Sequence, residues 1–211
     1  MSTKASPGVV AATQIAAGDD RTRYDEFSIA LHWLTVVLVL TQFALSQIWG
    51  FFPRPTRHVL IVAHMSFGIT LAAVVAVRII WRVTPGHRVR SAVVGWVELA
   101  SKAVHYLLYA LLVAEAVLGF VLRWSGHEAM SFFGLQIPPP FAPFSKPAHE
   151  FVGDLHSFVG WSIIVVAACH AAAALFHHFV LRDDVLMRML PGRHARRAEA
   201  QTLSPEQTIR R

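Results

Sequence analysis

Two histidines, His156 and His170, lie in a long apolar stretch near the end of the sequence. This stretch, residues 150–181, carries no charged residue between Phe158 and Phe176. It is longer than a membrane helix, which needs about 20 apolar residues. In a helix, the two histidines would stand about 21 Å apart along the axis, with both imidazoles on one face. Because an ionisable side chain inside a membrane is costly, this pattern predicts two stacked sites for a ligand that imidazole binds.

The composition favours a membrane protein. The chain has 211 residues, of which 55% are hydrophobic and 15% are charged, and its mean hydropathy is +0.47. These values exclude a disordered chain and disfavour an ordinary soluble domain. The sequence contains four apolar segments that are long enough to be spans, at residues 28–49, 58–82, 95–122 and 150–181.

We therefore predict an all-α fold, an integral membrane four-helix transmembrane bundle, in residues 21–191. The composition of residues 1–20 is typical of a disordered tail and does not resemble a signal peptide. Residues 192–211 form a polar, basic tail. Ser28 is the expected N-cap of the first span, and residues 123–149 are expected to form an amphipathic cap on the membrane surface.

The distribution of basic residues predicts the orientation. Four spans place both termini on one side, and that side receives 15 of the 19 Lys and Arg. The other four are Arg54, Arg57, Arg123 and Lys146. The positive-inside rule then predicts that both termini are cytoplasmic. The net charge of +6 is accounted for in this way, and the sequence contains no nucleic-acid-binding module.

This topology pairs four histidines by depth. His32 and His170 fall toward the cytoplasmic side, and His64 and His156 toward the outer side. Two neutral imidazoles from different helices, inside an apolar sleeve, are what bis-histidine haem b requires, so the pattern predicts two haem b groups. The single cysteine, Cys169, excludes c-type haem attachment.

Two other readings of these histidines stay open. A lone membrane histidine is more often a hydrogen-bonding residue between helices. Zinc or copper would need three or four close ligands.

Glycine follows each outer histidine by one turn, as Gly68 and Gly160, and would let a large ring approach the backbone. Residues 171–174 are all alanine and leave similar room beyond His170.

Several polar residues carry weaker predictions. Glu115 lies mid-span, where it is either a proton relay for quinone chemistry or a neutral group bonded to a neighbouring helix. His105 is a candidate contact for a haem propionate or a quinone, with a simple hydrogen bond as the alternative. His177 and His178 suit a helix C-terminus and are also candidates for propionate contacts. The remaining histidines are expected to be solvated: His58, His87, His127, His149 and His194.

Several segments resemble the bacterial cytochrome b561 family. They are SIALHWL (28–34), GFFPR (50–54), the region of His64, LHSFVGW, and CHAAAALFHHFVLRDDVLMRMLP (169–191). The resemblance covers residues 21–191 and is greatest to small four-helix di-haem members that act as superoxide:ubiquinone oxidoreductases. It implies that His32, His64, His156 and His170 are axial ligands of two b haems. It also implies an inner-membrane protein that moves electrons from a periplasmic donor to the quinone pool.

We accordingly expect an electron-transfer enzyme that oxidises superoxide and reduces ubiquinone. The outer basic residues would attract the superoxide anion, although anchoring to lipid head groups explains them equally well. The candidate catalytic residues are Arg54, Arg57, Lys146, His105 and Glu115. The resemblance gives no support to a proton-relay role of Glu115, because the family more often has an apolar residue or proline there. The alternative function is a membrane cytochrome b subunit of a hydrogenase or dehydrogenase that passes electrons to quinone.

Overall fold

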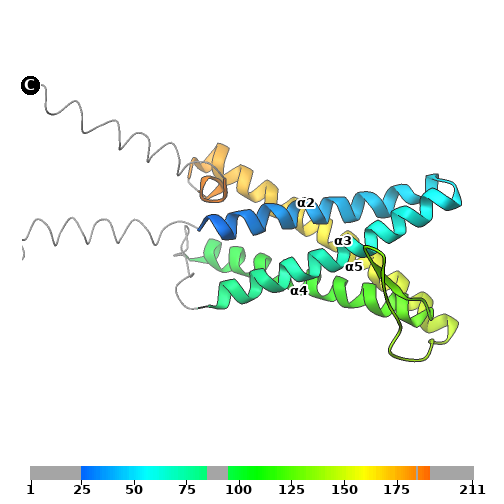
Figure 1. Ribbon diagram of the computed structural model, residues 1–211. Coiled ribbons are helices and arrows are strands. Elements are labelled where there is room, and N and C mark those ends of the chain that lie inside the picture. Colours follow the sequence, from blue (N-terminus) through cyan, green and yellow to red (C-terminus); the bar gives the residue numbers. More distant parts are fainter. Residues whose placement is uncertain (1–24, 85–94, 184, 191–211) are drawn as a thin grey trace, which may run out of the picture.

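The computed structural model describes residues 25–84, 95–183 and 185–190. Its main elements are four long helices, α2 (Glu26–Ile48), α3 (Arg54–Val83), α4 (Trp96–Ser125) and α5 (Lys146–Phe176) (Figure 1). All four are long and apolar enough to cross a membrane. The predicted four-helix transmembrane bundle is therefore confirmed. The two tails predicted at residues 1–20 and 192–211 lie outside the described residues.

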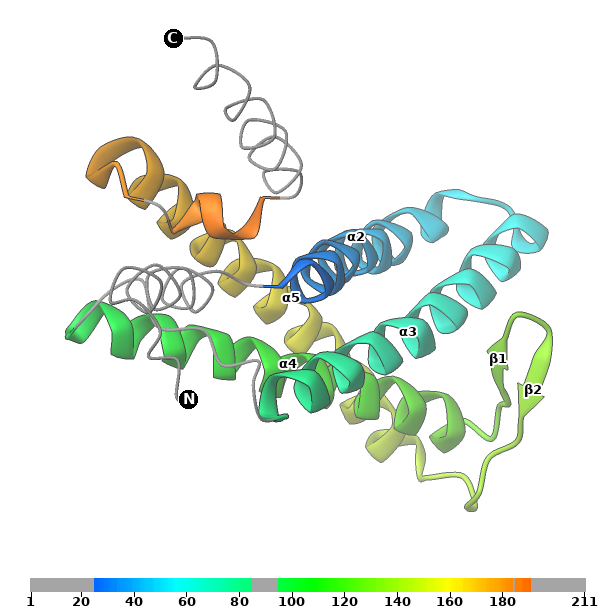
Figure 2. The ribbon, with the colours of Figure 1, turned by 60° about the vertical axis from the view of Figure 1, so that its left-hand side comes forward.

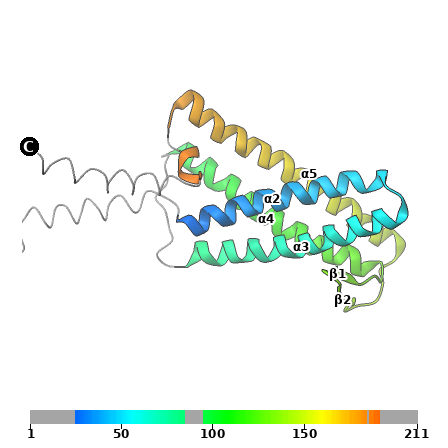
Figure 3. The same ribbon diagram turned by 45° about the horizontal axis from the view of Figure 1, so that its top comes forward.

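The helices alternate in direction, which gives the bundle two distinct ends. At the terminal end α2 begins and α5 finishes. At the hairpin end lie the short helix η2 (Trp49–Phe51) between α2 and α3, and the strands β1 (Met130–Phe132) and β2 (Leu135–Ile137) (Figures 1 and 3).

Consecutive helices pack side by side, α2 with α3, α3 with α4, and α4 with α5 (Figure 2). A small buried cluster of Val75, Leu112, Val159 and Ile163 joins α3, α4 and α5. Phe43 and Trp161, whose ring centroids are 4.8 Å apart, link α2 to α5. Large apolar side chains also cover the outer surface of the bundle. A membrane explains this surface, because lipid covers apolar side chains that water would leave exposed.

Asp25 caps the start of α2. Its carboxylate accepts a hydrogen bond from the Ser28 amide (3.3 Å) and another from the Ser28 hydroxyl (2.5 Å). The indole of Trp81, at the end of α3, donates a third (3.0 Å). Partial burial raises the pKa of Asp25, but these hydrogen bonds outweigh it and the pKa is lowered from 3.8. The expectation that Ser28 is the cap was wrong, since Ser28 is the donor and Asp25 the acceptor.

The second and fourth helices begin earlier than the expected starts at residues 58 and 150. Each has a proline in its first turn, Pro55 in α3 and Pro147 in α5. Proline is tolerated there because the amides of the first turn have no partner inside the helix. The prolines therefore belong to the helices and do not prolong the preceding loops.

The segment between α4 and α5 contains a β-hairpin. β1 pairs with β2 in antiparallel register, and a two-residue turn connects Phe132 to Leu135. Phe133 (φ 46°) and Gly134 (φ 96°) both have positive φ, as a tight hairpin turn requires. The Phe133 amide donates to the hydroxyl of Ser66 on α3 (3.0 Å), and Ser66 is only 1% exposed. The expected amphipathic cap is thus partly a hairpin fastened to α3.

The end of α5 changes its winding. A π-helical turn, η3 (His177–Leu181), follows α5, and Arg182 then takes the left-handed conformation (φ 55°). His177 Nδ1 lies 2.5 Å from Asp183 Oδ2. The next turn, η4 (Leu186–Met189), folds back toward α2, where the Trp33 indole donates to the Met189 carbonyl (2.8 Å). His177 therefore helps to shape the end of the helix.

Candidate functional site

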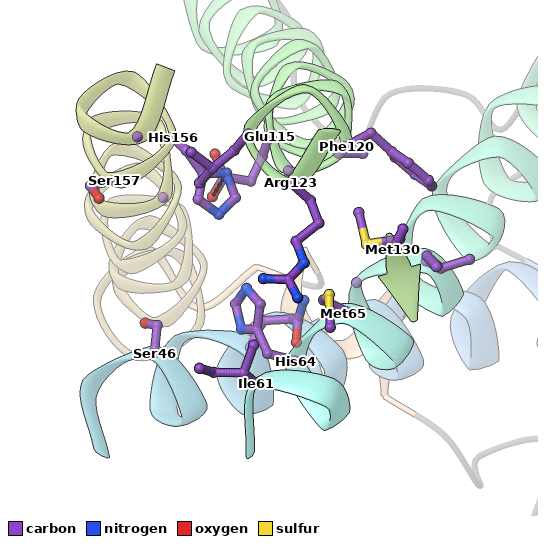
Figure 4. Close-up of a pocket in the computed structure, with 18 of the residues that line it drawn as sticks. Ser46, Ile61, His64, Met65, Glu115, Phe120, Arg123, Met130, His156 and Ser157 are labelled. Carbon is purple, nitrogen blue, oxygen red and sulfur yellow. Dashed lines mark ion pairs between the residues drawn. The ribbon is translucent and has the colours of Figure 1, made fainter. Parts of the chain in front are cut away.

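A cavity of about 980 Å³ lies in the hairpin half of the bundle. Its volume is near the upper limit of typical small-molecule and cofactor sites, about 300–1,000 Å³. Side chains of all four long helices and of the hairpin segment line it, and most of them are apolar (Figure 4). The ionisable residues among its lining are His64, Glu115, Arg123, Glu128, Lys146, His149 and His156.

His64 and His156 face each other across this cavity. His64 comes from α3 and His156 from α5 (Figure 4). Their ring centroids are 6.3 Å apart, and the ring planes are nearly perpendicular, at 85°. Metal–imidazole bonds are about 2.0–2.1 Å long, and a ring nitrogen lies about 1.1 Å from the centre of its ring. Two imidazoles on opposite sides of one metal ion therefore have centroids about 6.2 Å apart. The spacing therefore fits two imidazoles that would bind one iron.

The hydrogen bonding of the two rings also fits a ligand role. The Nδ1 atoms of His64 and His156 are buried and have no hydrogen-bond partner within the described part of the chain. Nδ1 of His156 lies 3.2 Å from Oε1 of Glu115, which is close enough for an ion pair. The two atoms are close, but the contact does not have hydrogen-bond geometry. Buried polar atoms without partners are rare. A histidine that binds a metal through one ring nitrogen carries its proton on the other, so each Nδ1 would then be an N–H donor.

Two basic side chains that reach solvent, Arg123 and Lys146, line one part of the cavity, which we call its mouth. The Arg123 guanidinium extends from α4 toward His64 (Figure 4), donates to the Ala129 carbonyl (3.2 Å) and pairs with Glu128. Lys146 lines the same mouth and is 3.8 Å from Glu150. Of the four outer basic residues named from the sequence, these two reach the cavity.

The other two outer basic residues lie elsewhere. Arg57 donates to the carbonyls of Trp49 (3.3 Å) and Gly50 (3.0 Å), so it holds the turn between α2 and α3. Arg54 is exposed at the start of α3. Neither is among the residues that line the cavity.

His149 differs from its sequence prediction. It was expected to be solvated, but it is half-buried, lines the cavity, and its Nδ1 lies 2.8 Å from the hydroxyl of Ser125. Ser125 is 1% exposed and also donates to the Leu122 carbonyl (2.9 Å). The contact joins the end of α4 to the start of α5, because the hairpin brings these helix ends together. His58 and His127 are exposed as expected, and His87 and His194 lie outside the described residues.

A second cluster of polar residues lies in the terminal half. The rings of His105 on α4 and His170 on α5 have centroids 4.9 Å apart. Nδ1 of His32 on α2 is 3.3 Å from Nη2 of Arg78 on α3. His32 also lies within electrostatic range of His105 and His170. Arg78 also lies over the ring of Tyr109, 5.5 Å from its centroid. The terminal half thus places three imidazoles and a half-buried guanidinium close together.

His105 is a stronger candidate here than its sequence position indicated. Its Nδ1 lies 2.6 Å from the Ser101 carbonyl, one turn earlier in α4. A carbonyl accepts from Nδ1–H and so fixes the tautomer, which leaves Nε2 without a proton and able to accept a hydrogen bond or bind a metal. The structure therefore adds His105 to the residues that can act beside His32 and His170.

Two polar residues of the site were missed from the sequence. Gln42 lies inside the first apolar span and lines the cavity, and Arg78 lies inside the second span and contacts His32. The sequence contained a signal for both, because a polar side chain inside a membrane span usually faces the bundle interior. Their partners were not readable, since they depend on how the helices are rotated.

Comparison with known proteins identifies the family. Residues 23–192 match the family described as prokaryotic cytochrome b561. The chain belongs to this family. Cytochrome b561 proteins of this group bind haem b and transfer electrons in the membrane. The residues of the hairpin-half cavity fit that cofactor by ring spacing and apolar lining.

Curated relatives of this cytochrome b561 protein agree with the assignment. Cytochrome b561 homolog 2 of Escherichia coli is 33% identical over 178 residues, which cover 80% of this chain and 91% of that protein. Cytochrome b561 homolog 1 of the same organism is 29% identical, over 81% of this chain and 98% of the relative. A protein named probable superoxide oxidase CybB, of Yersinia pestis, is 27% identical, over 80% of this chain and 96% of its own length.

Proposed function

We propose that this cytochrome b561 protein carries two b haems, oxidises superoxide at a periplasmic face and reduces ubiquinone in the bacterial inner membrane. The observation that supports it most is the pair of imidazoles 6.3 Å apart across a cavity of about 980 Å³. The relative named probable superoxide oxidase adds support for the substrate. The distribution of basic residues supports cytoplasmic termini and a periplasmic hairpin end.

Four histidines would hold the two haems. His64 and His156 would bind one iron in the hairpin half, and His32 and His170 the other in the terminal half. Bound haem supplies one-electron redox chemistry at both positions. The chain's own residues separate the ligand pairs, because His156 and His170 are about 21 Å apart along α5. This spacing would place one site near each face of the membrane.

The residues at the cavity mouth would select an anion. In the net reaction, two superoxide ions each lose one electron and leave as oxygen, and ubiquinone gains two electrons and two protons to become ubiquinol. Arg123 and Lys146 lie at the mouth and give it positive charge. Positive charge around an entrance raises the encounter rate with an anion, and added salt weakens the effect. Their acidic neighbours, Glu128 and Glu150, reduce this charge but keep the side chains in place.

Ubiquinone reduction driven by superoxide tests this proposal. Purified protein containing haem is supplied with superoxide and a soluble ubiquinone, and ubiquinol is measured with and without superoxide dismutase. We expect a rate well above the uncatalysed background that falls with ionic strength. A rate no higher than background would refute the superoxide activity. Reduction of the haems only by a co-purifying soluble protein would favour the alternative, a membrane subunit of a hydrogenase or dehydrogenase.

A matched pair of lysines sharpens the test. Lys146→Gln removes a charge at the cavity mouth, where Lys146 pairs with Glu150 four residues on. Lys102→Gln removes the same charge from an equivalent pair, Lys102 with Glu98, in the terminal half. We expect the first substitution, and not the second, to lower the rate at low salt. Equal effects would show that net charge, and not the cavity mouth, attracts superoxide.

A further inference from the structure

Glu115 lies beside a candidate haem ligand. It comes from α4, and its Oε1 is 3.2 Å from Nδ1 of His156 on α5. The same oxygen is 3.0 Å from the position that a Cβ would occupy on Gly160, one turn after His156. Its other oxygen, Oε2, is buried and has no hydrogen-bond partner in the described regions. The carboxyl group therefore occupies the space left by Gly160 and reaches the ring nitrogen that would not bind iron.

The same arrangement occurs between α2 and α3. Gly68 follows His64 by one turn, and Nε2 of Gln42 is 2.7 Å from the position of a Cβ on Gly68. His64 also interacts with the backbone of Gln42. However, neither Oε1 of Gln42 nor Nδ1 of His64 has a hydrogen-bond partner among the described residues. One atom is an acceptor and the other can be a donor, so a hydrogen bond between them would satisfy both.

The two glycines allow this approach. A Cβ on Gly160 or Gly68 would be 3.0 Å or 2.7 Å from the neighbouring side chain, which is closer than ordinary packing permits. Each outer histidine is thus followed by a gap, and the helix packed beside it places a polar side chain there, the Glu115 carboxyl group at Gly160 and the Gln42 amide group at Gly68. A histidine that binds iron through one nitrogen presents the other as an N–H donor, and its acceptor fixes the ring and raises the basicity of the ligand.

We propose that Glu115 and Gln42 are positioning residues that accept hydrogen bonds from Nδ1–H of His156 and His64. We further propose that the Glu115 carboxyl group lowers the redox potential of the iron held between these histidines. The inference rests on the proposed ligation by His64 and His156. Its physical basis is the hydrogen bond, because an acceptor for Nδ1–H raises the basicity of the ligand and so favours the ferric over the ferrous state. The Gln42 amide would orient its histidine with a smaller effect of this kind.

Exchanging the two side chains tests the inference. The variants are Glu115→Gln, Gln42→Glu and the double exchange, and the measurement is a redox titration that follows both haems by absorption. We expect Glu115→Gln to raise the ferrous-to-ferric ratio of one haem at least tenfold at fixed potential. For one electron, this corresponds to a redox potential that is higher by about 59 mV. Gln42→Glu should lower the same haem's potential. The double exchange should return it toward the wild-type value, because one carboxyl group again faces the pair.

Glu98→Gln provides a matched control. Glu98 is on the same helix, pairs with Lys102 and is about 26 Å from Glu115 along the helix axis. It should leave both potentials unchanged. A purely structural role of Glu115 predicts loss of haem without rescue by the double exchange.

Three outcomes decide between the possibilities. The inference is wrong if Glu115→Gln keeps both haems and changes the ferrous-to-ferric ratio of neither by more than twofold at fixed potential. Where that variant fails to fold, Gln42→Glu decides, because an unchanged potential there also contradicts the inference. If His64→Ala and His156→Ala both keep two haems, the proposed ligation itself fails.

Discussion

Gly119 offers a way to fill the hairpin-half cavity without changing a histidine. It lies on α4, lines the cavity, and a Cβ placed on it would be 3.5 Å from Cε1 of His156. That distance is ordinary van der Waals contact, so Gly119→Ala should be accepted. In Gly119→Leu the three carbons beyond Cβ must enter the cavity or displace His156. We therefore expect the leucine variant, and not the alanine variant, to exclude a haem from this half.

The size of the effect follows from packing. Inserting extra carbons into a filled site costs about 1–3 kcal/mol. Applied to the cofactor, this corresponds to about 5- to 150-fold weaker binding. The haem-to-protein ratio should therefore fall from about two toward one after purification, because the terminal-half site is untouched.

The assay is a pyridine haemochrome measurement against protein concentration, together with a reduced-minus-oxidised spectrum. Gly50→Leu is the matched control, because nothing lies within 4 Å of a Cβ placed on Gly50. The control should keep both haems. Full haem content and an unchanged spectrum in Gly119→Leu would refute the placement of a haem in this cavity.

Three further predictions concern separate parts of the molecule. The 85° angle between the rings of His64 and His156 predicts a strongly anisotropic low-spin ferric signal in electron paramagnetic resonance, and a signal typical of parallel rings would contradict it. Asp25→Ala should destabilise the protein by about 0.5–2 kcal/mol in thermal unfolding, because the Ser28 amide loses its cap. Since the pKa of Asp25 is lowered, the stability difference between wild type and Asp25→Ala should be full above pH 3.8 and shrink as the pH falls further. A pH-independent stability difference would show that the charge of Asp25 is irrelevant. Arg123→Gln should slow superoxide-driven ubiquinone reduction at low salt and leave the haem content unchanged, and an unaltered rate would remove Arg123 from the anion entrance.

Much of the fold was predictable from the sequence because a membrane leaves few alternatives. Apolar segments of this length must satisfy their backbone hydrogen bonds internally, so the sequence predicts helices, and the number of spans follows. The helix starts were less predictable. Pro55 and Pro147 indicate a turn when read alone, yet proline is equally suited to the first turn of a helix.

The site was predictable only in depth along the helices. Counting residues assigned His64 and His156 to the same level, and the structure places their rings 6.3 Å apart; their binding of iron stays a prediction. The contacts of Glu115 and Gln42 depend on helix rotation, which the sequence does not specify. The pairing of Ser125 with His149 was hidden for a similar reason, because it depends on how the hairpin brings two helix ends together.

Haem content in a set of histidine variants tests the central claim most directly. The claim is that His64 and His156 hold one haem and that His32 and His170 hold another. We predict that His64→Ala, His156→Ala and their double variant each retain about one haem per chain, because all three remove the same haem. Adding His170→Ala to the double variant should remove the second. Loss of both haems in the His64→Ala/His156→Ala variant, or retention of both, would contradict the account.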